Sequence, residues 1–196
     1  MSGAGKQPRY YVRDAAQADL EAVLAMKAAA WREAYGHLRD EAFFAAAEAT
    51  LPQQVEHWRR ELERGTELWL AEDAHGRCVG LASAGPAREA SPRPSGGAPR
   101  AANAGTGAPV DPAGPGLPSL ELHALYVLAE AQGTGVADAL MARAVGPAPC
   151  RLWVLAVNDR ARAFYRRHGF VDVDAPQPMS GPWEGLDAQL MVRRGA

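Results

Sequence analysis

One segment of this 196-residue chain cannot contribute to a hydrophobic core, and it decides where the folded part must lie. Residues 85–118 contain eight Pro, seven Gly and eight Ala, and their only larger aliphatic residues are one Val and one Leu. Such a segment buries too little apolar surface to offset the entropy that it loses on ordering. We therefore interpret residues 85–118 as a flexible insertion within a single domain, residues 1–196. The strands expected on either side of it should then be neighbours in one sheet.

The remaining residues alternate between strand patterns and helix patterns. The expected strands are residues 9–13, 68–72, 78–82, 120–128, 151–157, 170–173 and 185–192. The expected helices are residues 17–35, 41–49, 52–64, 135–145 and 159–168. This order predicts an α/β fold in which helices flank a mixed sheet.

The charge balance and the cysteines bear on partners and location. Lys and Arg total 21 and Asp and Glu total 23, which gives a formal net charge of −2 and a pI near 6.2. Because no strong basic field is present, we expect neither nucleic acid nor a membrane as a partner. The first residues carry no apolar signal segment, and Cys78 and Cys150 lie far apart in the sequence. We therefore expect a cytoplasmic protein with no metal site and no disulfide framework.

The strongest local signal runs from Leu125 to Leu140, where a strand leads into a Gly-rich turn and then a helix. The unpaired N–H groups of a first helical turn favour an anion, and the helix dipole adds to this. Gly133 and Gly135 leave no Cβ between the backbone and a ligand, so a pyrophosphate can approach closely. The segment lacks the end of a Walker A loop and the third Gly of a dinucleotide-binding fingerprint. A Gly turn used only for tight packing is the alternative.

A second motif begins at Asn158, and the two motifs together resemble those of the GNAT superfamily of N-acetyltransferases. The acetyl-CoA loop of that family, Gln/Arg-x-x-Gly-x-Gly/Ala, is matched by Gln132, Gly135 and Ala137. One departure is Ala129, where many members carry Pro. The family's following motif, Asn-x-x-Ala-x-x-Phe-Tyr-x-x-x-Gly-Phe, is matched by Asn158, Ala161, Phe164, Tyr165, Gly169 and Phe170.

The resemblance implies a mostly antiparallel, twisted central sheet whose fourth and fifth strands splay apart to admit the acyl-pantetheine arm of acetyl-CoA, the co-substrate. The apolar alternation changes phase between Leu122 and Leu125, as a β-bulge would cause; a misplaced strand boundary is the alternative. The residues implied for binding acetyl-CoA are Leu125, Tyr126, Val127, Gln132, Gly133, Thr134, Gly135, Val136, Ala137, Asn158 and Tyr165.

The resemblance also implies direct attack of a primary amine on the acetyl thioester, with no metal ion. An ammonium has no lone pair, so a base is needed. Glu121 is the first candidate and His123, on the same strand face, is the second; a reaction that uses neither is the third possibility. The N–H of Val127 is implied as a donor to the thioester oxygen. Tyr165 is implied as the acid for the leaving thiolate, and its alternative is a packed ring with its hydroxyl in solvent.

Three further residues have weaker assignments. Asn158 is expected to cap its helix as well as to contact coenzyme A. Trp31 and Tyr35 lie one turn apart on the first helix and are expected, with His123, to line the acceptor site.

The amine acceptor is not identified by the sequence, because this scaffold serves many acceptors. The oligomeric state is open as well, although many relatives form homodimers. A non-catalytic module that binds or senses acyl-CoA is the alternative function, and a longer acyl donor is a further possibility. The pair of Glu121 and Tyr165 favours the enzyme, since a module that only binds needs neither group.

Overall fold

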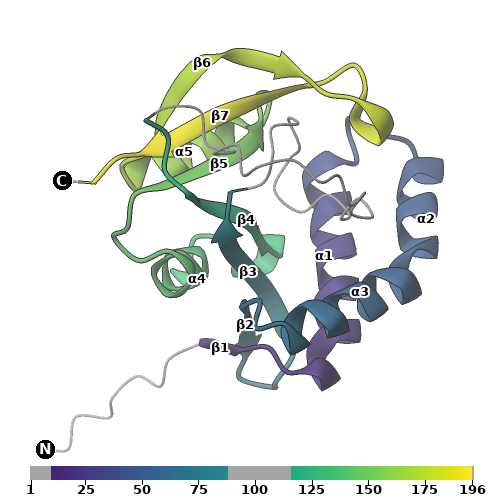
Figure 1. The fold of residues 1–196 in the computed structure, drawn as a ribbon. Helices are drawn as coiled ribbons and strands as arrows, with labels where there is room; N and C mark the ends of the chain where they lie inside the picture. Colours follow the sequence, from purple (N-terminus) through teal and green to yellow (C-terminus); the bar gives the residue numbers. More distant parts are fainter. Residues whose placement is uncertain (1–9, 88–115, 196) are drawn as a thin grey trace, which may run out of the picture. The chain divides into compact units, whose positions relative to one another are not determined.

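The computed structural model describes residues 10–87 and 116–195. Its strands are hydrogen-bonded in the order β1-β2-β3-β4-β5-β7-β6 (Figure 1). The chain forms two compact units, and strands β3 (Cys78–Pro86) and β4 (Leu120–Val127) contribute residues to both. Residues 88–115 of the expected insertion lie outside the described residues. Gly85 and Pro86, expected to begin that insertion, instead end β3.

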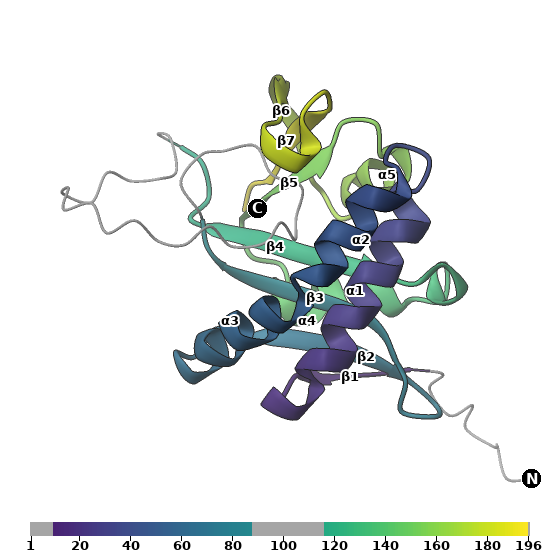
Figure 2. The ribbon, with the colours of Figure 1, turned by 90° about the vertical axis from the view of Figure 1, so that its right-hand side faces the viewer.

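The first unit contains residues 10–82 and 126–143 of the described chain. Its longest helix buries Leu20, Val23 and Leu24, and the two following helices pack against it; Figure 2 shows α2 running along α1. The first two strands pair antiparallel. The elements that lie wholly in this unit are β1 (Tyr10–Asp14), η1 (Gln17–Asp19), α1 (Leu20–Tyr35), α2 (Glu41–Ala49), α3 (Leu51–Glu63), β2 (Leu68–Asp73) and η2 (Ala129–Ala131), and α4 (Val136–Ala144) lies in it up to Arg143.

The second unit contains residues 83–87, 116–125 and 144–195 of the described chain. Strand β5 is buried at every residue and pairs antiparallel with β7, from Cys150 opposite Arg193 to Leu155 opposite Ala188. On its other side, β5 pairs in parallel with β4, with Glu121 opposite Arg151. The remaining elements of this unit are β5 (Cys150–Leu155), α5 (Asp159–Arg167), β6 (Val171–Pro178), η3 (Gly181–Trp183) and β7 (Asp187–Arg193).

Strand β6 is longer than the expected residues 170–173. It continues to Pro178, with a register shift against β7 between Val173 and Gln177. Two prolines argue against a strand here, because Pro cannot donate to a ladder. The strand order places β6 at an edge of the sheet, where a missing donor is tolerated.

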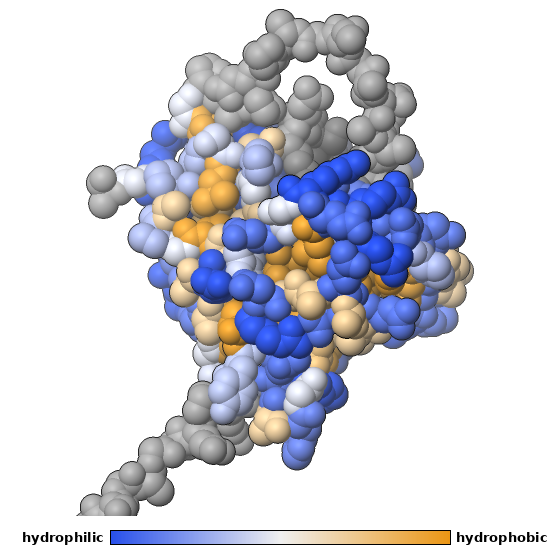
Figure 3. All heavy atoms as spheres, turned by 60° about the horizontal axis from the view of Figure 1, so that its bottom comes forward, coloured by the Kyte–Doolittle hydropathy of each residue, from blue (hydrophilic) through white to orange (hydrophobic). Residues whose placement is uncertain are grey.

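One face of the described residues is mostly polar. Hydrophilic residues dominate the face in Figure 3, where hydrophobic residues show between them. The large hydrophobic side chains that are exposed among the described residues are Tyr11, Val157 and Val171. Within residues 10–87 and 116–195, no helix has both the length and the apolar character needed to cross a membrane.

Candidate active site

The turn that follows β4 has the backbone that the sequence predicts for an anion site. We call residues 132–136 the glycine turn. Gly133 and Gly135 have φ angles of +72° and +92°, in the left-handed region that L side chains rarely adopt. An added Cβ on either glycine would have no atom of residues 10–87 or 116–195 within 4 Å. These positions therefore need glycine because of their backbone conformation, and no packing against the protein requires it.

Side chains of the turn hold its own backbone. Gln132 donates from Nε2 to the carbonyl oxygen of Val127 at 3.1 Å, and Thr134 donates from Oγ1 to the carbonyl oxygen of Ala131 at 2.5 Å. Both residues were expected to contact acetyl-CoA. In the structure their side chains fix the path of the chain from β4 to α4.

The backbone of the turn leaves donors available at the start of α4. Within the part of the chain that the structure describes, the N–H groups of Gly133, Gly135 and Val136 have no hydrogen-bond acceptor. Gly133 and Gly135 are exposed, and Val136 begins a helix of nine residues. Free N–H groups and the positive end of a helix dipole together favour a phosphate or another anion.

Burial along β4 does not distinguish the two strand faces where the sequence predicts a change of phase. Leu122, Ala124 and Tyr126 are all buried, whereas Leu125 and Val127 are half-buried. Residues 121–124 are buried on both faces of the strand, so the burial of a side chain there does not indicate which face it occupies. The bulge between Leu122 and Leu125 stays a prediction.

In the second unit, Glu121 is buried and paired. Arg151 donates from Nε to Oε2 of Glu121 at 3.2 Å, and the two side chains are only 5% and 10% exposed, respectively. The sequence analysis did not identify the partner Arg151. An arginine inside the apolar run Cys150–Leu155 was the signal that could have identified it, because a buried guanidinium needs an anion.

His123, the second candidate base, is also buried. Its Nε2 lies 3.0 Å from the carbonyl oxygen of Pro86. A carbonyl oxygen only accepts, so this contact places the ring hydrogen on Nε2. The contact makes Nε2 a donor, which leaves the lone pair of the neutral ring on Nδ1.

Two residues of the second motif, Asn158 and Tyr165, lie at the start of helix α5 and within it, as the sequence predicts. Asn158 caps the helix, and its Oδ1 accepts from the N–H of Ala161 at 3.1 Å. Tyr165 is 4% exposed and packs edge-to-face against Phe170, with ring centroids 5.8 Å apart. The ring of Tyr165 is therefore packed, as both roles considered for this residue require, and its role as the acid stays a prediction.

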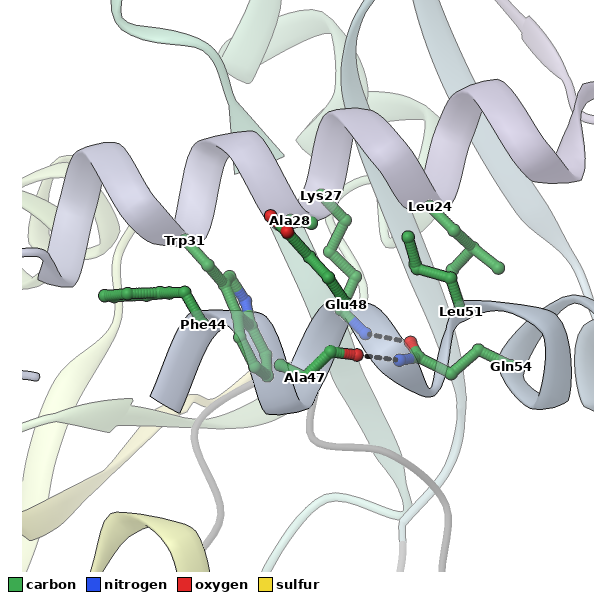
Figure 4. Close-up of a pocket in the computed structure, with 9 residues that line it drawn as sticks. All are labelled: Leu24, Lys27, Ala28, Trp31, Phe44, Ala47, Glu48, Leu51 and Gln54. Carbon is green, nitrogen blue, oxygen red and sulfur yellow. Dashed lines mark hydrogen bonds between the residues drawn. The ribbon is translucent and has the colours of Figure 1, made fainter. Parts of the chain in front are cut away.

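The aromatic residues of α1 are buried in the first unit. Trp31 packs edge-to-face against Tyr126, with ring centroids 6.2 Å apart, and Tyr35 is 6% exposed. Trp31 also lines a small pocket between α1, α2 and α3, in which Lys27 donates from Nζ to Gln54 at 3.3 Å (Figure 4). The part of Trp31 and Tyr35 in acceptor binding stays a prediction.

Neither cysteine has the properties of a nucleophile. Cys150 is buried and Cys78 is half-buried, and desolvation raises the pKa of each thiol to about 11. Among residues 10–87 and 116–195, no group of three or more His, Cys, Asp or Glu side chains could hold a metal ion.

The family of the chain follows from a comparison with known protein families. Residues 64–172, more than half of the chain, match the family described as "Acetyltransferase (GNAT) domain". This protein belongs to the GNAT acetyltransferases, and its general reaction is acetyl transfer. A search of curated proteins found no match.

Solved structures share the fold at low sequence identity. The PaiA N-acetyltransferase of Thermoplasma acidophilum, in complex with coenzyme A, has a TM-score of 0.63 and 18% identity, over 94% of this chain and 98% of that one. The ribosomal-protein-alanine N-acetyltransferase of Brucella melitensis has a TM-score of 0.61 and 22% identity, over 94% and 99%. A SpeG spermidine N-acetyltransferase chimera, from Vibrio cholerae and hSSAT, has a TM-score of 0.58 and 14% identity, over 95% of each chain.

Proposed function

We propose that this protein transfers the acetyl group of acetyl-CoA to a primary amine by direct attack. The observation that carries the proposal is the glycine turn, where two left-handed glycines and N–H groups that have no acceptor among the described residues meet the positive end of α4. In a GNAT acetyltransferase, this turn fits the pyrophosphate of coenzyme A. Bound coenzyme A in the Thermoplasma relative supports the same assignment.

The proposal gives each catalytic residue one task. Acetyl-CoA supplies the acetyl group as a thioester. The backbone N–H of Val127 donates to the thioester oxygen, where negative charge develops during attack. Glu121 accepts a proton from the ammonium form of the acceptor, and Tyr165 donates a proton to the departing thiolate. We favour Glu121 over His123 as the base, because Glu121 lies at the position on this strand where many GNAT members carry their base.

We also propose that the protein acts in a reducing compartment. Cys78 and Cys150 are free thiols, as is usual in the cytoplasm. The acceptor is a small molecule or a peptide with a primary amine. Relatives of this fold are named for acceptors as different as a ribosomal-protein alanine and spermidine, so the fold does not choose between them.

A panel of amines tests the proposal. The full chain is incubated with acetyl-CoA and one amine at a time, drawn from peptide N-termini, lysine, polyamines, aminoglycosides and free amino acids. Release of the coenzyme A thiol is followed, with a reaction lacking amine as the background. Calorimetry measures acetyl-CoA binding to the protein and to Glu121→Gln separately.

The expected result is thiol release that depends on one class of amine and is strongly reduced in Glu121→Gln. Binding of acetyl-CoA without release above background for any amine would favour a non-catalytic acyl-CoA-binding module. Absence of acetyl-CoA binding would overturn the assignment of the glycine turn.

A further inference from the structure

We infer that Glu33 is a positioning residue, which fixes the η2 turn and through it the glycine turn; the inference rests on the proposed function. The backbone N–H of Ala129 donates to Oε2 of Glu33 at 2.8 Å. Glu33 belongs to α1, 96 residues earlier in the chain, and Ala129 is the first residue of η2. The contact therefore ties the helix to the segment that leads out of β4.

The residue at position 129 makes this contact possible. Many GNAT members carry Pro at this position, and Pro has no N–H and a fixed φ. Ala129 keeps both a donor and a free φ, so the chain leaving β4 is less constrained by its own covalent structure. Glu33 accepts from the donor that a proline would lack. In this chain, the hydrogen bond from Ala129 to Glu33 therefore constrains the turn in place of a proline ring.

The backbone before Ala129 has a conformation that also suits proline. Leu128, which precedes it, has φ −57° and ψ 147°, the extended conformation that proline requires of its predecessor. The first position of a helical turn is also where proline is best tolerated. The backbone at position 129 therefore accepts proline, and the exposed Glu33 carboxylate, which lies 2.8 Å from the nitrogen of Ala129, must move away to make room for the ring.

Neighbouring contacts hold the same region. Leu128 donates its N–H to the carbonyl oxygen of Val79 at 3.0 Å, and Arg77 pairs with Glu130 at 2.5 Å. These contacts fix residues 128 and 130, and Glu33 fixes the residue between them. The adjacent Arg32 pairs with Glu41 and Glu48 and not with Glu33. Among these contacts, the carboxylate of Glu33 accepts only from η2.

Glu33 acts on ligand binding through the backbone. A turn that is already ordered loses less entropy when it binds. Loss of the Glu33 contact should therefore weaken coenzyme A binding while the chemical step, which uses other residues, keeps its rate.

A double-mutant cycle tests the inference. The four full-length proteins are the original chain, Glu33→Ala, Ala129→Pro and the double variant. Their coenzyme A affinity is measured by calorimetry, and their steady-state kcat and KM for acetyl-CoA are determined. Glu21→Ala is the matched control, because Glu21 is an exposed glutamate of the same helix, in its first turn.

We expect Glu33→Ala to raise the Kd for coenzyme A about three- to tenfold, the value of one ordinary hydrogen bond at an exposed site, with kcat unchanged. Glu33→Gln should keep part of the affinity, because its amide oxygen still accepts. In the Ala129→Pro background, where position 129 has no N–H, Glu33→Ala should change the Kd less than twofold. An equal effect in both backgrounds, or no effect in either, would overturn the inference.

A second measurement does not depend on coenzyme A. Amide hydrogen exchange in the free protein, read by mass spectrometry, should quicken over residues 128–135 in Glu33→Ala and not in Glu21→Ala. Unchanged exchange there would reject the positioning role even if coenzyme A binds. If exchange quickens but no variant binds coenzyme A, the positioning role stands and the proposed function fails.

Discussion

Glu121 and Arg151 face each other across the parallel strands β4 and β5 as a buried ion pair, with 3.2 Å between Nε and Oε2. The ion pair holds the side chain of the proposed base in one orientation. A buried charge that loses its partner destabilises a protein by about 3–5 kcal/mol, whereas apolar replacement of both partners is often neutral. Stability and catalysis can therefore be separated at this site.

We predict that Arg151→Met lowers the free energy of unfolding by about 3–5 kcal/mol, because Glu121 is left buried without its guanidinium. The double variant Glu121→Leu with Arg151→Met should recover most of that stability. It should not recover turnover, because the base is absent. Urea unfolding and thiol release measure the two effects. An active double variant would show that Glu121 is not the base.

Tyr165→Phe should lower kcat by roughly ten- to a thousandfold, the range for loss of one general acid, with acetyl-CoA affinity unchanged. The ring of Tyr165 packs on Phe170, and phenylalanine preserves that packing, so the melting temperature should hold. Tyr11→Phe, at an exposed tyrosine of β1, is the control. Full turnover in Tyr165→Phe would mean that the thiolate leaves without this acid.

The parts of the site that the sequence predicts are local ones. The glycine turn and the Asn158 cap each depend on residues within a few positions of one another, so a short segment of the sequence determines their geometry. Gly133 and Gly135 adopt the left-handed backbone that such a turn requires.

The parts that it misses depend on partners distant in sequence. Arg151 lies 30 residues from Glu121, and Glu33 lies 96 residues from Ala129. The alternation of apolar and polar residues in a segment does not indicate which strand or helix will pack beside it. The length of β6 was missed for a related reason, because an edge position is a property of the whole sheet.

Asp19 gives a prediction for acid stability. Hydrogen bonds from Arg13, at 2.7 and 2.8 Å, lower the pKa of this carboxyl below its ordinary value. A folded-state pKa below the unfolded one stabilises the protein above about pH 4 and loses that effect as the pH falls through the folded-state pKa. Asp19→Asn should therefore be less stable than the original chain at pH 7, and the difference should shrink at pH 3.

Urea unfolding at the two pH values measures the difference for Asp19→Asn. Asp187→Asn, which removes an exposed carboxylate at the start of β7, is the control and should differ little from the original chain at either pH. A difference in unfolding free energy between Asp19→Asn and the original chain that is as large at pH 3 as at pH 7 would contradict the role of the Asp19 charge.

Gly135→Ala separates ligand binding from backbone strain. Gly135 has φ +92° and Gly65, at the end of α3, has φ +84°, and an added Cβ at either would have no atom of the described residues within 4 Å. An alanine in this conformation costs about 1–2 kcal/mol at either position, so both variants should lose similar stability.

Only Gly135→Ala should also weaken coenzyme A binding, because its Cβ stands beside the N–H groups at the start of α4 that have no acceptor in the described part of the chain. Calorimetric titration of both variants with coenzyme A measures the affinity, and thermal unfolding confirms that the strain is matched. We expect at least a tenfold rise in Kd for Gly135→Ala and less than a twofold change for Gly65→Ala. Equal affinities would mean that Gly135 serves the fold of the turn and that the pyrophosphate does not approach it closely.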